Sequence, residues 1–370
     1  MRITQNGMKK QYLRNSNSAL ERMSKINNRI LTERKFMRAS EDSTAAANAM
    51  IIRKSLSNLN MYEANIKNVQ ALYSSAESHI MTISEKTSNV TTQLIYGVNG
   101  DKSDTERSII ARELENFAEQ MKTELNDMYS DRQIFGGTNN SSVPITYDEA
   151  TRTVSYNGVP VNAMLTEETD AAGNTICKFN GNTITDPDKI KEGKVRNYNM
   201  FPNSDPIYVD VGIGIKYEYE KDANGNEIMD TAKVNPDTAI NVALNACEMT
   251  GSGVDEDGDS RNIIQLTFDA AEALRNGDKE TCWRLLDKIY AAQEEVLIGL
   301  TNFGAKSESL DFHLDKVETD RYNLQVQQKE IEAADLTQEI TDYKSAQAAY
   351  NATLQMGSSV LPSSIFDFIR

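Results

Sequence analysis

Histidine and cysteine side chains, which often bind metal ions or take part in nucleophilic catalysis, are few in this chain of 370 residues, and they are scattered. The two histidines, His79 and His313, have neither a cysteine nor a second histidine near them in the sequence. A histidine-based metal or catalytic site requires several such groups to converge on one point. The three cysteines, Cys177, Cys247 and Cys282, are widely spaced and odd in number, so they define no disulfide framework. These residues therefore predict neither a metal centre nor a catalytic site.

An alternating acidic run, Asp255, Asp257 and Asp259, is the sequence feature that comes closest to a cation site. In an EF-hand loop that begins at Asp255, the sixth position must be glycine and the twelfth must be glutamate. Those positions are Ser260 and Leu266 here, so the calcium-binding pattern fails. We interpret the run as a solvated acidic loop and expect no metal.

The sequence gives equally little support for a nucleotide, a nucleic acid or a membrane span. Gly212 and Gly214 form only a Gly-x-Gly pattern, without a third glycine or a following helix, which is typical of strand glycines. The net charge of −16 argues against a general nucleic-acid binder. No run of about 18 apolar residues appears, and the N-terminal stretch lacks the apolar core of a cleavable signal peptide. We therefore expect no cofactor, no nucleic acid, no membrane span and no enzymatic activity.

The strongest pattern in the chain is a narrow apolar stripe towards its C-terminal end. Leu310, Val317, Leu324 and Ile331 recur every seven residues. After a shift in phase, the stripe continues with alternating steps of three and four at Ala333, Leu336, Ile340, Tyr343, Gln347, Tyr350 and Leu354. This spacing places one stripe along one side of a helix, and no proline interrupts it. We expect a single helix of about 50 residues, from residue 306 to residue 356, which needs partner helices to cover its stripe.

A partner helix is expected at the other end of the chain, over residues 6–36. Its apolar side chains share one face at Leu20, Met23, Ile26 and Ile30. Residues 1–38 contain ten Lys or Arg and two acids, a net charge of about +8, whereas residues 305–357 contain ten acids and five bases, a net charge of about −5. The two ends therefore attract each other, although exposed ion pairs contribute little individually and are screened by salt.

Two arrangements of these terminal helices are compatible with the sequence. They can pack together inside a monomeric bundle, or they can form a coiled coil between neighbouring chains, which the narrow stripes favour. In the second case we expect the ends to be disordered in an isolated chain and to become helical on assembly. The expected assembly interface consists of Leu20, Met23, Ile26, Ile30, Leu336, Ile340, Tyr343, Tyr350 and Leu354.

The rest of the chain has a nested order. With Ser40 as the expected N-cap, helical patterns run over residues 43–96 and 105–130, and they return at 239–248, at 262–276 and after Asp278. Between them, a strand-like period of two dominates. We therefore expect a mainly α fold with a β insertion: a long-helix bundle formed by the N- and C-terminal halves, terminal coiled-coil helices and an outer β domain. The expected divisions are a terminal coiled-coil assembly domain (1–40 and 333–370), a helical bundle domain (41–137 and 236–332) and an inserted β domain (138–235), the last dispensable for assembly.

Several short motifs at both ends resemble the flagellin superfamily, and specifically its hook–filament junction proteins. Residues 38–46 resemble the family's Arg-Pro-Ser-Asp-Asp-Pro-Ala-Ala motif, although Ala39 and Ser43 replace its two prolines. Residues 334–340 (ADLTQEI) are similar to its Asp-Leu-x-x-Glu-Ile signature. Further similar segments are the opening MRIT and residues 62–72, 104–114, 134–138 and 365–368. The resemblance covers residues 1–138 and 236–370, whereas the insertion matches only in position.

The resemblance implies a structural adaptor of the bacterial flagellum that joins hook to filament by coiled-coil and lateral helical packing. The partners it implies are copies of this chain in a ring-like homo-oligomer, the other hook–filament junction protein, flagellin and a flagellar export chaperone. It also implies a location at the hook–filament junction, outside the cell, after signal-peptide-independent type III export. Two alternatives stay open. One is a filament flagellin, which should carry Ser-Gly-x-Arg-Ile where this chain has residues 32–38, and the other is an adhesin or enzyme carried by the β insertion.

Overall fold

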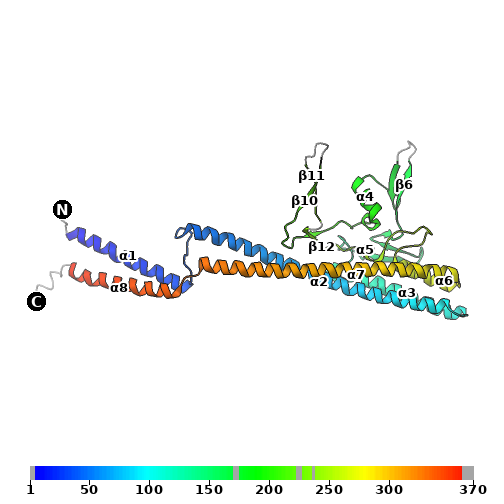
Figure 1. Ribbon diagram of the computed structural model, residues 1–370, viewed down its shortest axis with the longest axis horizontal. Helices are drawn as coiled ribbons and strands as arrows, with labels where there is room; N and C mark the ends of the chain where they lie inside the picture. Colours follow the sequence, from blue (N-terminus) through cyan, green and yellow to red (C-terminus); the bar gives the residue numbers. More distant parts are fainter. Residues whose placement is uncertain (1–4, 170–174, 222–226, 236–237, 361–370) are drawn as a thin grey trace. The chain divides into compact units, whose positions relative to one another are not determined.

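The computed structural model describes residues 5–169, 175–221, 227–235 and 238–360. The chain forms two compact units, and each combines segments from both halves of the sequence: a terminal unit (residues 1–61 and 318–370) and a central unit (residues 62–317). Long helices dominate, and the described strands lie between residues 128 and 241 (Figure 1). The expected fold class, a mainly helical chain with a strand-rich insertion, is confirmed, whereas the expected three-part division stays a prediction.

The terminal unit is built from helical segments of both chain ends. They are α1 (Gln5–Thr32), the first part of α2 (Ser43–Val98), the last part of α7 (Lys279–Glu332) and α8 (Leu336–Val360). The expected single helix over residues 306–356 is therefore wrong, because the chain leaves the helix between Glu332 and Leu336. Asp335 starts the new helix: its Oδ1 accepts hydrogen bonds from the backbone N–H groups of Thr337, at 2.9 Å, and Gln338, at 3.2 Å. The break coincides with the phase shift in the heptad pattern.

The connection from α1 to α2 also differs from the expected one. α1 ends four residues earlier than expected, because Glu33 adopts the left-handed conformation with φ 55°, which stops the helix. Asp42, rather than Ser40, caps α2, since its Oδ1 accepts a hydrogen bond from the Ala45 N–H at 2.9 Å. The neighbouring carboxylate of Glu41 accepts a hydrogen bond from the Met37 N–H at 2.9 Å, and this bond lowers the pKa of Glu41.

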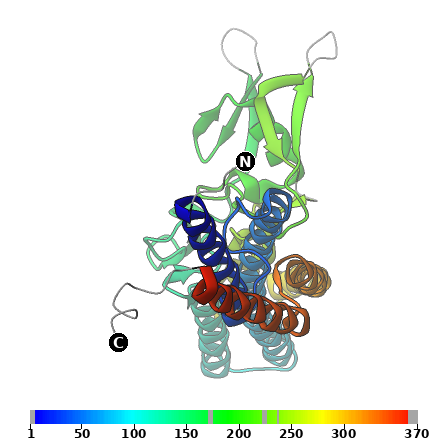
Figure 2. The same ribbon diagram turned by 90° about the vertical axis from the view of Figure 1, so that its left-hand side faces the viewer.

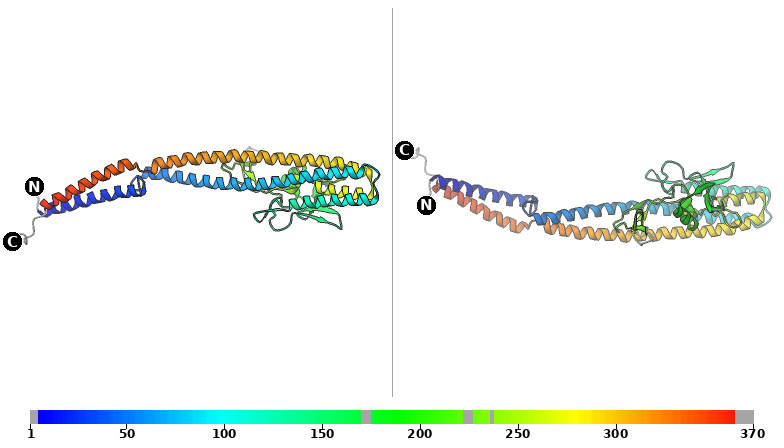
Figure 3. Two further views of the ribbon diagram at one scale, coloured as in Figure 1. Left: turned by 90° about the horizontal axis from the view of Figure 1, so that it is seen from below. Right: turned by 90° about the horizontal axis from the view of Figure 1, so that it is seen from above.

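The helices of the central unit enclose most of the apolar core. Together with parts of α2 and α7, they are α3 (Asp104–Leu125) and α6 (Ile263–Asn276), which pack against each other (Figure 3). α2 and α7 meet through Tyr73 and Phe303, whose ring centroids are 5.3 Å apart. Asn262 and Asp278, at which these two helices were expected to begin, act as caps and accept hydrogen bonds from the first turns of α6 and α7. The core contains the fully buried side chains of Ile66, Tyr73, Ile80, Ile83, Leu94, Leu114, Met121 and Leu125.

Short antiparallel strands fill the insertion, and no large sheet forms among the described residues. One three-stranded sheet contains β3 (Ile145–Asp148), β4 (Thr153–Tyr156) and β5 (Val159–Pro160), and a second contains β6 (Leu165–Thr169), β7 (Thr175–Phe179) and β8 (Asn182–Ile184). Three two-stranded pairs lie within the insertion or beside it: β1 (Met128–Tyr129) with β2 (Arg132–Gln133), β9 (Tyr208–Val209) with β12 (Ile240–Asn241), and β10 (Tyr217–Lys221) with β11 (Glu227–Val234). The helical elements are α4 (Pro187–Val195), the short 3-10 turn Asn197–Met200 and α5 (Ala246–Thr250).

The sheet β3–β4–β5 packs on α6. Tyr147 stacks on Phe268, with ring centroids 3.9 Å apart. Gln265 accepts a hydrogen bond from the Val154 N–H at 2.7 Å and donates one to the carbonyl of Arg152 at 3.0 Å. The insertion therefore covers part of the helical core, and removal of the whole of residues 138–235 would expose it.

The expected helix over residues 239–248 is wrong. Ile240 and Asn241 form strand β12, and only α5 follows as a helix, capped by Asn245. Residues 236–237, just before this segment, lie outside the described residues. β10 and β11 form an antiparallel hairpin, and the connection between them, residues 222–226, also lies outside the described residues.

Candidate assembly interface

The two helices at the chain ends, α1 and α8, pack side by side in opposite directions (Figures 1 and 2). Of the two arrangements compatible with the sequence, the structure therefore contains the helix pair within one chain. The predicted interface residues all lie on this pair, which the structure brings together, but they do not share one environment. Half-buried positions are Met23, Ile26, Ile30, Tyr343 and Tyr350, and exposed positions are Leu20, Leu336, Ile340 and Leu354.

The inner face of the pair is made by small residues as well as by the half-buried apolar ones. Ala346 is only 8% exposed, and Gly357 is buried. A Cβ atom on Gly357 would lie 2.1 Å from the Tyr12 hydroxyl, so the absent side chain lets the helices approach. Sequence reasoning missed both residues, because neither belongs to the apolar stripe.

Burial within the pair is slight. Among the described side chains of α1 none is buried, and in α8 only Ala346 and Gly357 are. Hydrophobic stabilisation scales with the apolar area removed from water, so this pair gains little from its own contact. Ordering a chain segment costs about 1–2 kcal/mol per residue, and the isolated pair has little burial to offset that cost.

The outer face of the pair exposes large apolar side chains that nothing covers in the described part of the chain. On α1, Leu13 and Leu20 are seven residues apart and are 50% and 44% exposed. On α8, Ile340 and Leu354 are each 44% exposed, and Leu336 is 39% exposed. Several exposed apolar side chains on one helix pair are a candidate interaction site. We define the outer face by Leu13, Leu20, Leu336, Ile340 and Leu354.

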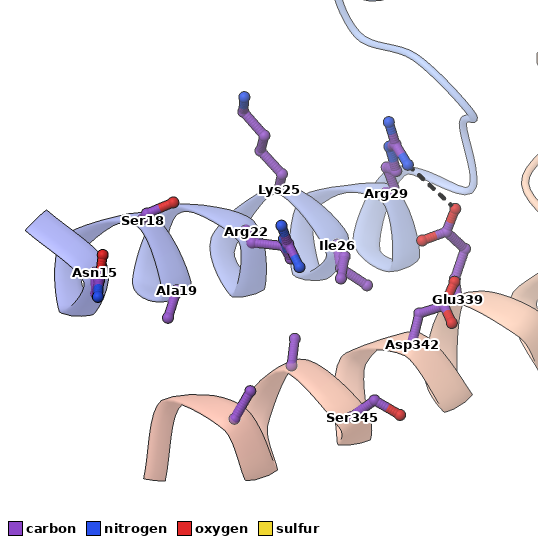
Figure 4. A pocket seen from close by; sticks show the side chains of 12 residues that line it. Asn15, Ser18, Ala19, Arg22, Lys25, Ile26, Arg29, Glu339, Asp342 and Ser345 are labelled. Atoms are coloured by element: carbon purple, nitrogen blue, oxygen red, sulfur yellow. Dashed lines mark ion pairs between the residues drawn. The ribbon is translucent and has the colours of Figure 1, made fainter. Parts of the chain in front are cut away.

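Opposite charges line a groove of about 660 Å³ between the two helices (Figure 4). Its α1 wall carries Arg22, Lys25 and Arg29, and its α8 wall carries Glu339 and Asp342. One ion pair spans it, from Arg29 Nη1 to Glu339 Oε1 at 3.6 Å. A single half-exposed ion pair contributes little to stability. The opposite charges of the groove therefore contribute more to the specificity of helix pairing than to its free energy.

The acidic run does not form an open cation site. The ammonium of Lys288 on α7 binds the carboxylates of Asp255 at 2.6 Å, Asp257 at 3.0 Å and Asp259. Burial opposes the charge on Lys288, but the three hydrogen bonds outweigh it and raise its pKa. The loop is therefore closed around a lysine, with Asp255 and Asp259 half-buried, and is not the solvated loop that we expected.

The other candidates for chemistry are structural in the described residues. His79 Nδ1 lies 2.7 Å from Glu124 Oε2, and its ring packs edge-on against Phe135. The three cysteines are buried and unpaired, and burial raises the pKa values of Cys247 and Cys282. No helix among the described residues is both long enough and apolar enough to cross a membrane. The terminal helix pair is therefore the candidate functional site.

Comparison with known proteins shows what the N-terminal helices are similar to. Residues 3–140 match the profile of the bacterial flagellin N-terminal helical region. A search of curated protein sequences finds no match. The profile match confirms the resemblance to flagellins over α1, α2, α3 and the start of the insertion.

Among solved structures, one shares its fold with most of this chain. A protein described as a flagellar hook-associated protein of Vibrio parahaemolyticus aligns with a TM-score of 0.52 at 14% identity, over 79% of this chain and 100% of that one. FlgL of Bacillus cereus aligns with a TM-score of 0.46 at 14% identity, over 75% and 99% of the two chains. The flagellar junction protein FlgL of Legionella pneumophila aligns with a TM-score of 0.41 at 12% identity, over 78% and 100%. Residues 3–140 thus match the bacterial flagellin N-terminal helical region, and the chain shares its fold with the Vibrio hook-associated protein.

Proposed function

We propose that this chain is a structural component of the bacterial flagellum, an adaptor that joins hook to filament. Two findings support the proposal: the flagellin N-terminal match over residues 3–140, and the fold shared with a protein described as flagellar hook-associated. The observation on this chain that carries it is the uncovered outer face of the α1–α8 pair. The role is structural and not enzymatic.

The outer face supplies the means of assembly. When copies of the chain stand side by side, Leu20 of one copy can pack against Ile340 or Leu354 of the next, and the half-exposed area of each side chain is removed from water. Because α1 is strongly basic, its contact with a neighbouring α8 is favoured over its contact with another α1, since like charges repel. Repetition of this contact around an axis closes a ring if the rotation per copy divides a full turn.

The proposed partners follow from the same role. They are further copies of this chain, the other hook–filament junction protein, flagellin, and an export chaperone that covers the apolar face of α8 before assembly. The proposed location is the hook–filament junction outside the cell, reached by export without a cleavable signal peptide. Slight burial in the α1–α8 pair suits passage of an unfolded chain, because little structure has to be undone.

A deletion strain tests the role. Cells that lack this chain should make hooks without attached filaments and should release flagellin into the medium, and a plasmid copy of the wild type should restore filaments. Filaments that stay attached in the deletion strain would contradict an adaptor role. If the deletion strain instead retains the other junction protein on its hooks and simply lacks the filament subunit, the chain is a filament flagellin.

A further inference from the structure

The α1–α8 pair is joined to the rest of the terminal unit at one place. The connections are residues 33–42, between α1 and α2, and residues 333–335, between α7 and α8. They meet as a short antiparallel bridge between Arg34 and Ala333. The Lys35 N–H donates to the Glu332 carbonyl at 2.8 Å, and the Ala334 N–H donates to the Glu33 carbonyl at 2.9 Å. We call these residues, 33–35 and 332–334, the joint.

The joint has almost no apolar support. None of residues 33–42 and 333–335 is buried, and only Phe36, Ala333 and Ala334 are half-buried, so packing does little to fix the direction in which the α1–α8 pair leaves it. Glu33 sits in the left-handed region at φ 55°, a conformation that a residue with a Cβ seldom adopts. The two backbone hydrogen bonds and the side chains around them must therefore hold the angle.

Glu332 is the residue on which these contacts converge, and it is only 8% exposed. Its Oε1 accepts hydrogen bonds from Arg53 Nε on α2 at 2.9 Å and from Gln328 Nε2 on α7 at 3.3 Å. Arg53 Nη2 also lies 2.8 Å from the same oxygen. Its main-chain carbonyl accepts the Lys35 bond, and Lys35 Nζ reaches the carbonyl of Glu330 at 2.6 Å. One residue thus connects α2, α7 and the joint.

From this convergence we propose that Glu332 is a latch. While it holds Arg53 and Lys35, the α1–α8 pair has one direction relative to the ends of α2 and α7 within the terminal unit. When the contacts of Glu332 with Arg53 and Lys35 break, the α1–α8 pair rotates about the joint as a rigid body, because α1 and α8 lie outside the joint. The latch deepens the proposed function, since copies in an adaptor that face unlike neighbours on its two sides need more than one setting of their assembly helices.

Hydrogen exchange on the isolated full-length chain tests the latch without any assembly. The reporters are the amides of Lys35 and Ala334, which make the two bridge bonds. Glu332→Gln keeps the size of the side chain and removes its charge, and it should speed exchange of both amides about tenfold, because charge-assisted bonds are about twice as strong as neutral ones. As a matched control, Glu115→Gln removes the exposed Arg275 ion pair of the central unit, which spans 2.6 Å, and should leave both amides unchanged.

A second readout measures the pivot itself. Spin labels at Ser57→Cys on α2 and Ala348→Cys on α8 occupy exposed positions, and the three native cysteines are buried, so they compete little for the label. The distance between the labels should spread over a wider range in Glu332→Gln than in the otherwise wild-type chain. A separate, unlabelled variant carries Arg34→Cys and Ala333→Cys, because the antiparallel bridge places these two residues at a spacing suited to a disulfide. When the two cysteines are oxidised to a disulfide, the reporter amides should exchange more slowly than in the wild type.

Three results would overturn the latch. One is equal exchange of the Lys35 and Ala334 amides in the wild type and in Glu332→Gln. Another is equal acceleration by the Glu115→Gln control, which would indicate a general loss of stability. The third is a wild-type chain whose reporter amides exchange at the unprotected rate. None of these results bears on whether the chain joins hook to filament, because the deletion strain tests that separately.

Discussion

Replacement of Asp269 by asparagine should stabilise the central unit at neutral pH. The Asp269 carboxyl on α6 is largely buried, and burial raises its pKa from 3.8 to about 6, while a hydrogen bond from Gln265 Nε2 at 2.8 Å partly opposes the rise. The folded chain therefore holds a proton between about pH 4 and pH 6 that the unfolded chain has lost. In that interval stability falls as the pH rises, and the full penalty is present at pH 7.

The size of the effect follows from the shift. A rise of the Asp269 pKa by roughly 2 corresponds to about 3 kcal/mol of lost folding free energy, since a pKa change of one corresponds to about 1.4 kcal/mol. The asparagine side chain would stay neutral at every pH, and its Oδ1 could still accept the Gln265 bond. The substitution should therefore add up to about 3 kcal/mol to the free energy of unfolding at pH 7 and almost nothing at pH 4.

Urea unfolding at pH 4, 5, 6 and 7 measures this difference, and Trp283 on α7, the single tryptophan, reports on the central unit. Asp278→Asn is the matched control. Hydrogen bonds from the Thr281 side chain and main chain lower the pKa of Asp278, so its substitution should not stabilise the chain at pH 7. The reasoning is refuted if Asp269→Asn is no more stable than the wild type at pH 7, or if its advantage is the same at pH 4.

Three further predictions concern assembly, the insertion and the acidic loop. Ile340→Asp places a charge on the outer face, so cells with this variant should export a folded chain yet fail to retain filaments. The control Ala352→Asp, on another exposed part of α8, should retain filaments. Normal motility with Ile340→Asp would show that the outer face is not an interface. Deletion of residues 217–234 should change the melting temperature by only a few degrees, because the Asn235 N–H already lies 2.9 Å from the Lys216 carbonyl and a glycine can close the gap. Deletion of residues 138–235 should lower the melting temperature strongly, because it exposes Phe268. Equal melting temperatures of the two deletion variants would contradict the conclusion that the insertion covers α6. Lys288→Gln should lower the free energy of unfolding in urea by about 1–3 kcal/mol, because the clustered carboxylates lose their cation. An unchanged free energy of unfolding would mean that water replaces the ammonium group without cost.

Much of the fold could be predicted because its signals are local. The caps Asn262 and Asp278, the strands Ile145–Asp148 and Thr153–Tyr156, and the long periodic helices all follow from residues close in sequence. The break between α7 and α8 could not, because Ala333 and Ala334 are good helix formers. The chain leaves the helix there through a bond from Ala334 to Glu33, at the far end of the sequence.

The same distinction applies to the segment after the hairpin. Residues 239–248 have a helical composition, yet Ile240 and Asn241 pair with Val209 and Tyr208 of β9. Pairing with a distant strand overrides local preference, and no pattern in the segment itself announces it.

The residues of the candidate site could be predicted from the sequence. Which of them lie on the half-buried inner face and which lie on the exposed outer face could not. The heptad positions identify Ile26, Ile340 and Tyr343 alike, because the period reports only that a side chain belongs to the stripe. Ile340 is exposed and the other two are half-buried because small residues such as Ala346 and Gly357 draw one side of α8 towards α1. Which side that is depends on the register of the pair.

Hydrogen exchange over residues 20–30 and 340–354 tests the central claim, that the terminal helix pair is an assembly interface. It should be compared between the isolated chain, at concentrations where it is monomeric, and hook–filament junctions purified from cells. We predict weak protection of both segments in the isolated chain, because the pair buries few side chains of its own, and strong protection in the junctions, where neighbouring copies cover Leu20, Ile340 and Leu354. Strong protection already present in the isolated chain, with no increase in the junctions, would contradict the claim and leave α1 and α8 as a helix pair that serves only the fold of one chain.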